Sequence, residues 1–298
     1  ADLSPLRPPL LAPTPPMGWS SWNTFGRSVS EALIRETADA MISSGMAAAG
    51  YRYVNVDDGW QAPERDAAGD LQADPARFPS GIQALADYAH ERGLRFGLYT
   101  SVGTRTCLGL PGSLGHEKAD ARLFASWGVD YLKDDFCGGP CWTRWSFWPW
   151  WDYRKHYAAM GSALEATGRP IVLSLCSWGF GEPWKWEPQV GHLWRTTWDI
   201  FPYWRWIMRI LDVQRGLEAY AGPGRWNDPD MLEVGVPPMT VEESRAHFSL
   251  WAILAAPLIA GNDIRRMTPE VRAILLNPEV IAVNQDPAGI QGRLVSDP

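Results

Sequence analysis

Short apolar runs alternate along this chain with longer segments in which apolar residues recur at helical spacing. β-Branched and aromatic side chains dominate the short runs, a composition that favours β-strands. The runs predict eight strands, at Met17–Trp19, Tyr51–Val56, Arg95–Thr100, Tyr131–Asp134, Ile171–Leu175, Leu193–Thr197, Arg225–Asp228 and Leu258–Ala260. A helical segment follows each strand. Two of these helices carry the spacing of a capping box, Ser28 with Glu31 and Thr240 with Glu243.

Eight strands, each followed by a helix, predict an α/β fold, the (β/α)8 TIM barrel, over residues 17–288. An open doubly wound sheet is the alternative. It is disfavoured because no GxGxxG motif follows the first strand. Residues 1–16 form a Pro-rich lead-in, and the start at Ala1 is typical of a secreted protein whose leader has been removed, so we expect secretion.

Composition narrows the classes of function. The 298 residues are 46% hydrophobic and 20% charged, which suits a chain with a sizeable core. A formal net charge of −7 disfavours nucleic acid and anionic membranes as partners, because their binders are normally basic. No apolar run approaches the ~20 residues that span a bilayer. Four cysteines without CxxC spacing disfavour a zinc site and permit two disulfides, with buried free thiols as the alternative.

A barrel places its functional groups at the C-terminal ends of the strands, and polar or aromatic residues occupy those positions here. They are Trp22, Asp57, Asp58, Tyr99, Lys133, Asp134, Asp135, Ser177, Arg195, Asp199, Asp228 and Asp230. A single Asp at a strand end is usually a loop cap or a turn former. Acidic groups at the ends of four different strands converge on one mouth, which capping does not explain.

Converging carboxylates with one Lys, one Arg and several Trp favour glycoside hydrolysis. Two carboxyl groups would flank the scissile bond, and the others would bind hydroxyl groups through charge-assisted hydrogen bonds. A metal-dependent hydrolase is the rival class, since Asp-rich mouths hold Mg²⁺ or Ca²⁺. The Lys and Arg argue against it, because they supply the compensating charge. A lectin-like barrel without catalysis is the third class.

Eight stretches of the chain resemble glycoside hydrolase family 27, which contains α-galactosidases and α-N-acetylgalactosaminidases. They follow the family's order and read PPMGWSSWNTFG (15–26), YRYVNVDDGW (51–60), FGLYTSVGTRTC (96–107), GVDYLKDDFC (128–137), SLCSWG (174–179), WRTTWDI (194–200), GRWNDPDMLEVG (224–235) and VNQDPAGIQGR (283–293). The resemblance implies a retaining glycosidase that acts on carbohydrate and needs no cofactor and no metal.

Carried over residue by residue, the resemblance implies that Asp135 is the nucleophile and Asp199 the acid/base. A general acid must start protonated, so we expect Asp199 to be buried among other carboxylates. Cys107 and Cys137 match a disulfide beside the nucleophile. The sugar-binding positions are Trp22, Asp57, Asp58, Tyr99, Cys107, Lys133, Ser177, Phe180, Arg195 and Asp230.

The expected substrate carries a terminal α-D-galactosyl group, because Asp57 and Asp58 match the pair that binds the 4- and 6-hydroxyls of galactose. Ser177 keeps α-N-acetylgalactosamine as the alternative, since most α-galactosidases of the family have Glu there. Phe180 argues against it, because the N-acetylgalactosaminidase branch has Ala at that position. Isomalto-dextranase and β-L-arabinopyranosidase activities also occur in the family.

Three further interpretations concern single regions. The Trp-rich segment 141–153 is either a wall for leaving-group sugars or a flap that packs its own rings. The residues that would extend such a wall are Trp184, Trp186, Trp204 and Trp206. Cys141 and Cys176 would form a second disulfide. In the family a C-terminal β domain begins near this point, so 289–298 is expected to start the linker to it.

Overall fold

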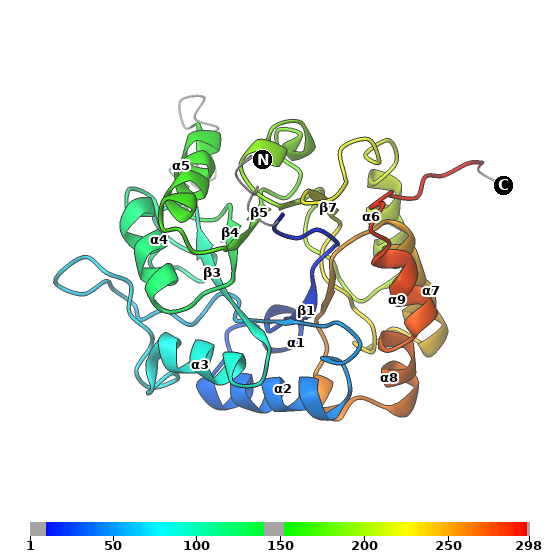
Figure 1. The fold of residues 1–298 in the computed structure, drawn as a ribbon, viewed down its shortest axis with the longest axis horizontal. Helices are drawn as coiled ribbons and strands as arrows, with labels where there is room; N and C mark the ends of the chain where they lie inside the picture. Colours follow the sequence, from blue (N-terminus) through cyan, green and yellow to red (C-terminus); the bar gives the residue numbers. More distant parts are fainter. Residues whose placement is uncertain (1–9, 140–151, 297–298) are drawn as a thin grey trace, which may run out of the picture.

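The computed structural model describes residues 10–139 and 152–296, and in this part of the chain eight parallel strands form one sheet in the order β7-β6-β5-β4-β3-β2-β1-β8. The helices lie outside the strands (Figure 1). The predicted α/β barrel is confirmed, and each predicted strand overlaps an observed one. The strands are β1 Met17–Ser20, β2 Tyr53–Asn55, β3 Arg95–Ser101, β4 Tyr131–Asp135, β5 Val172–Cys176, β6 Leu193–Arg195, β7 Trp226–Asp228 and β8 Leu258–Ala260.

The longer α-helices connect these strands and lie around them (Figure 1). The α-helices are α1 Trp22–Phe25, α2 Glu31–Ser43, α3 Gly81–His90, α4 Glu117–Ser126, α5 Tyr153–Ala166, α6 Trp204–Val213, α7 Val241–Ile253, α8 Pro269–Leu275 and α9 Pro278–Asn284. Three short 3₁₀ segments are η1 Pro183–Lys185, η2 Glu187–Gln189 and η3 Ile264–Arg266. Within the described residues, no helix has the length and apolar character that crossing a membrane requires.

The barrel closes between β8 and the residues that follow β7. The backbone N–H of Leu232 donates to the carbonyl oxygen of Ile259 at 2.8 Å, and the N–H of Gly261 donates to the carbonyl oxygen of Leu232 at 3.0 Å. Leu232 and Ala260 thus form a parallel bridge. The loop after β7, which carries Asp230, is therefore held in the barrel wall.

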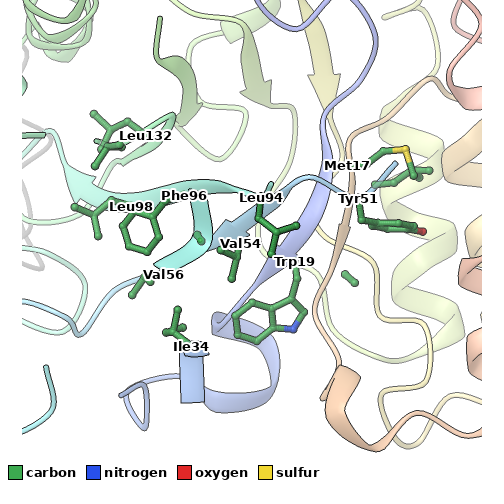
Figure 2. Close-up of a cluster of buried hydrophobic side chains, with 14 of the residues drawn as sticks. Met17, Trp19, Ile34, Tyr51, Val54, Val56, Leu94, Phe96, Leu98 and Leu132 are labelled. Atoms are coloured by element: carbon green, nitrogen blue, oxygen red, sulfur yellow. The ribbon is translucent and has the colours of Figure 1, made fainter. Parts of the chain in front are cut away.

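Two apolar layers form because successive side chains of a strand point to opposite faces. Val54 and Val56 face outward and share the main core with Ile34 of α2, next to Trp19 of β1 (Figure 2). Tyr53 faces inward. It belongs to a second buried cluster that contains the first residue of each of four other strands, Tyr131, Val172, Leu193 and Trp226.

Residues 10–16 of the lead-in pack under this inner cluster. Ala12 is buried there, and its carbonyl oxygen accepts a hydrogen bond from the indole N–H of Trp226 at 2.9 Å. The carbonyl oxygen of Pro16 accepts from the N–H of Leu258 at 2.9 Å. The N-terminal end of the barrel is therefore filled by apolar side chains and by the lead-in segment. A functional site can then open only at the opposite, C-terminal end of the strands.

One predicted helix start is wrong. Ser28 and Glu31 do not form a capping box, because Ser30 is the N-cap of α2 and accepts from the backbone of the first turn. The carboxylate of Glu31 instead accepts from the backbone N–H of Ser80 at 2.9 Å, so it does not reach back to its own helix start. The box predicted at 240–243 is present at the start of α7.

Candidate active site

A pocket of about 190 Å³ opens at the C-terminal ends of the strands. Both catalytic candidates line it, as does every predicted sugar-binding residue except Ser177 and Phe180. The described residues around it are Trp22, Asn23, Asp57, Asp58, Tyr99, Cys107, Lys133, Asp135, Arg195, Asp199, Ile200, Phe201, Pro202, Asp230, Met231 and Glu233. Residues at the ends of β2, β3, β4, β6 and β7 therefore meet in one pocket, as the strand-end rule predicts.

The carboxylate of Asp135, the last residue of β4, is fixed by two donors. Its Oδ2 accepts from the hydroxyl of Tyr99 at 3.0 Å, and its Oδ1 accepts from the backbone N–H of Phe136 at 2.7 Å. The Cys107–Cys137 disulfide lies beside it, with the two Cα atoms 5.0 Å apart, and this bridge was predicted. A side chain held this way keeps one orientation, which is what nucleophilic catalysis would require of it.

Opposing effects act on the charge of Asp135. Burial raises the pKa of its carboxyl group, while the ammonium of Lys133 and the Phe136 N–H offset part of that increase. For Lys133, burial acts to lower the pKa, but the carboxylates of Asp57 and Asp135 outweigh it and hold that pKa well above its usual value. Lys133 therefore stays charged and supports the ionised form of Asp135.

Asp57 and Asp58 follow β2 and differ in their partners. Asp57 Oδ2 accepts from Lys133 Nζ at 2.9 Å. Asp58 Oδ2 accepts from the backbone N–H of Leu108 at 2.8 Å, whereas its Oδ1 is buried without a partner among the described residues. Burial raises the pKa of Asp58 to about 6. A buried acceptor without a partner is costly, so Asp58 Oδ1 is suited to a substrate hydroxyl.

Arg195 links the two carboxylates on the other side of the pocket. One guanidinium nitrogen lies 3.1 Å from Asp199 Oδ1 and 2.9 Å from Asp230 Oδ2. Asp230 has a φ of +83°, a left-handed backbone conformation that non-glycine residues rarely adopt. Its carboxylate also accepts from the backbone N–H of Ile200 at 2.9 Å. Strain at Asp230 is thus compensated by bonds that position the segment after β6.

The expected burial of Asp199 is wrong. Its side chain is 53% exposed, whereas that of Asp230 is 8% exposed. The difference arises because Asp199 lies four residues beyond the end of β6, where the loop carries it to the rim of the pocket. A general acid at the rim is placed where the leaving group departs into solvent.

Ser177 and Phe180 lie outside the pocket lining. The hydroxyl of Ser177 is buried and donates to Glu187 Oε1 at 2.9 Å. The ring of Phe180 is 53% exposed, and its centroid lies 5.9 Å from that of Phe136. The steric comparison between Ser177 and Phe180 therefore stays a prediction about the sugar 2-position.

Sequence reasoning missed two polar residues of the pocket, Asn23 and Glu233. The amide of Asn23 donates to Glu233 Oε1, and Glu233 Oε2 is buried without a partner among the described residues. Burial raises the pKa of Glu233 to about 8. Both residues stand within stretches quoted above, but neither falls at the end of a strand, so the strand-end rule did not select them.

A metal site finds little support in the described residues. The cluster with enough potential ligands is Cys107, Cys137 and Asp135, and its two sulfur atoms are joined in the disulfide rather than free as thiolates. Cys176 is a buried free thiol, and the second disulfide stays a prediction because its expected partner lies outside the described part of the chain. Cys141 lies outside the described residues, as does the segment up to residue 151.

Three comparisons with known proteins agree with this geometry. The family model for α-galactosidase A matches residues 14–286. The α-galactosidase A of Cellvibrio japonicus is 53% identical over 292 residues, which cover 94% of this chain and 70% of the relative. The solved α-galactosidase I of Mortierella vinacea is 40% identical with a TM-score of 0.89, covering 97% of this chain and 77% of that one.

A solved α-galactosidase of Saccharomyces cerevisiae with raffinose is 38% identical, with a TM-score of 0.86, and covers 94% of this chain. This chain spans 66% of the yeast chain and about two thirds of the curated relatives' length. The family model covers nearly the whole of the described chain, and the site residues lie within it. The chain therefore belongs to glycoside hydrolase family 27, the α-galactosidase family that its motifs resemble.

Proposed function

We propose that this chain hydrolyses terminal α-D-galactosyl groups from oligosaccharides or polysaccharides by double displacement. The observation that carries the proposal is the placement of Asp135 and Asp199 in one pocket, the first fixed by Tyr99 and the second exposed at the rim. The α-galactosidases among its relatives support the choice of sugar.

In the first displacement, Asp135 attacks the anomeric carbon and the bond to the glycosidic oxygen breaks. Asp199, protonated, gives its proton to that oxygen, so the leaving group departs as a neutral alcohol. A covalent glycosyl ester on Asp135 remains. In the second displacement, the Asp199 carboxylate takes a proton from water, the water oxygen attacks the anomeric carbon, and the carboxylate of Asp135 is released. The sugar leaves with its original anomeric configuration.

Recognition of the sugar is assigned to the charged groups around Asp135. The unpartnered Asp58 Oδ1 accepts from a hydroxyl, and Asp57, paired with Lys133, presents a second acceptor beside it. Such a site rejects analogues that lack the hydroxyl, because its polar groups would remain buried and unpaired. Trp22 at the same wall offers an apolar face to the sugar ring.

The Cys107–Cys137 disulfide supports a further proposal, that the protein acts outside the reducing cytosol, as a secreted enzyme would. Detection of the protein in the culture medium of the source organism, with this bridge intact by mass spectrometry, would test it. Recovery only from the cytosolic fraction would contradict it.

The experiment that tests the function is a hydrolysis profile with and without a chelator. The substrates are four aryl glycosides: α-galactoside, α-N-acetylgalactosaminide, α-glucoside and β-L-arabinopyranoside. We expect the α-galactoside to be cleaved fastest, with and without EDTA. Preference for the N-acetylated sugar would favour the alternative that Ser177 suggests. Loss of activity in EDTA would favour a metal-dependent hydrolase, and no cleavage of any substrate would favour a binding module.

A further inference from the structure

An exposed aromatic cluster lies next to the acid/base. It consists of Trp198, Phe201 and Trp206, here named the β6–α6 shelf. The ring centroid of Trp206 lies 6.0 Å from that of Trp198 and 5.5 Å from that of Phe201, both at steep angles. Trp198 is 44% exposed and Phe201 51% exposed. Rings of this size normally bury most of their surface, so a group of them left open to solvent indicates a binding surface.

Hydrogen bonds attach the shelf to the catalytic residues. The indole N–H of Trp206, in the first turn of α6, donates to the carbonyl oxygen of Asp199 at 2.8 Å. The backbone N–H of Ile200 donates to the carboxylate of Asp230 at 2.9 Å. The backbone on both sides of the acid/base is therefore fixed, and the Trp206 ring needs little ordering when a ligand binds.

The shelf flanks the acid/base in the chain and reaches the pocket through Phe201. Asp199 stands between Trp198 and Phe201 in the chain, and Phe201 lines the pocket that also holds Asp135. The acid/base must contact the oxygen that joins the galactosyl group to its leaving group. The group attached to that oxygen therefore leaves the pocket at the rim beside Asp199, which Trp198 and Ile200–Phe201 flank in the chain.

We infer that the β6–α6 shelf is the subsite for a sugar ring in the leaving group, which stacks its C–H face against the exposed face of Trp198. This inference rests on the proposed function. The occupant is a neutral hexose unit of an oligosaccharide or polysaccharide, because the shelf offers flat apolar surface, while the hydrogen-bonding groups of the pocket serve the galactosyl ring. Selectivity for longer substrates then comes from contacts that a small leaving group cannot make.

Two substrates with the same galactosyl group and different leaving groups test this inference. Raffinose carries a sugar leaving group, whereas α-galactosyl fluoride carries a single atom that departs without stacking. Trp198→Ala is expected to lower kcat/KM for raffinose by roughly 10-fold to 100-fold, the range for a lost apolar contact to substrate. The value for α-galactosyl fluoride should change by less than about twofold. Trp198→Phe keeps an aromatic face and should restore most of the raffinose activity.

Tyr88→Ala is the matched control, since its ring lies on α3, stacked by the guanidinium of Arg92 and outside the pocket. It should leave both substrates unaffected. An unchanged ratio of raffinose to fluoride activity in Trp198→Ala would overturn the subsite, whether both activities stay at the wild-type level or both fall by the same factor. If the wild-type protein cleaves neither compound, the proposed function itself fails, which is a different result from an unchanged ratio.

Discussion

The ammonium of Lys133 donates a hydrogen bond to the carboxylate of Asp57 across 2.9 Å, joining β4 to the end of β2 beneath the pocket. The Asp57 side chain is 3% exposed and that of Lys133 is 22% exposed. Water therefore screens this pair little, and each charge depends on the other. The same ammonium supports the ionised form of Asp135. One ion pair thus serves both the stability of the barrel end and the charge of Asp135, the proposed nucleophile.

Replacing Lys133 should therefore lower stability and activity together. Lys133→Met leaves the Asp57 carboxylate buried without its counter-ion, which we expect to lower the free energy of unfolding by about 3 kcal/mol. Urea denaturation measures it. The control is Lys185→Met, whose ion pair with Glu182 is exposed and whose loss should leave the unfolding midpoint unchanged. Equal effects at the two lysines would contradict a special role for the buried pair.

Removing Asp135, the proposed nucleophile, should nearly abolish turnover and allow chemical rescue. Asp135→Ala should lower kcat by several orders of magnitude, and azide should restore part of the activity by attacking the anomeric carbon in place of the carboxylate. The product would then be a β-galactosyl azide, identified by NMR. Asp199→Ala should lower turnover by ~10²–10⁴-fold, the usual contribution of acid/base catalysis.

Asp134→Asn is the control for both variants. Asp134 is the neighbour of the nucleophile on β4 but is buried outside the pocket lining, and burial raises its pKa well above the ordinary value for Asp. An amide resembles the neutral acid, so this variant should retain activity of the same order as the wild type. Loss of activity in Asp134→Asn comparable to that in Asp135→Ala would remove the distinction between the two carboxyl groups.

Strand-level features could be predicted from the sequence because they depend on local composition. Eight β-branched or aromatic runs mark eight strands, and the strand-end rule selected Asp58, Asp135 and Asp230 correctly for the pocket. Side-chain partners could not be predicted, because they depend on contacts across the chain. The Glu31 carboxylate, for example, accepts a hydrogen bond from the backbone N–H of Ser80, 49 residues later, rather than from the start of its own helix.

The position of Ser177 shows the same limit. Its hydroxyl is taken by Glu187, a residue of a short 3₁₀ segment that no periodicity indicates. Family motifs predicted which residue type stands at 177, but not which neighbour it contacts. Exposure of Asp199 was likewise missed, because the length and path of the loop after β6 decide it rather than its composition.

Loss of the Cys107–Cys137 disulfide, which lies beside Asp135, should lower the stability of the protein. Cys107 and Cys137 are separated by 30 residues, and losing a bridge that closes a loop of this size is expected to lower the unfolding free energy by about 3.6 kcal/mol. The double variant Cys107→Ala/Cys137→Ala should show this decrease in urea denaturation. Reductant should bring the wild type toward the double variant and leave the double variant unchanged. Two free thiols at these positions in the oxidised wild type would contradict the bridge.

Glu233 should make the protein less stable as the pH rises. Burial raises its pKa from about 4.5 to about 8 in the folded protein, so between these values the folded chain binds a proton that the unfolded chain has released. Stability then falls with increasing pH across that window, by up to about 1.4 kcal/mol per pH unit. Glu233→Gln cannot ionise and keeps the oxygen that accepts from Asn23. It should therefore match the wild type near pH 4.5 and exceed its unfolding free energy at pH 8, measured by urea denaturation across the window. The opposite slope, with the wild type gaining stability relative to Glu233→Gln above pH 6, would show that Glu233 is ionised and paired in the folded protein.

Kinetics add an independent readout, because ionisation of Glu233 places a further negative charge near Asp230. The alkaline limb of kcat/KM should shift in Glu233→Gln, while Glu242→Gln, on the first turn of α7 and outside the pocket lining, should leave both the stability profile and that limb unchanged.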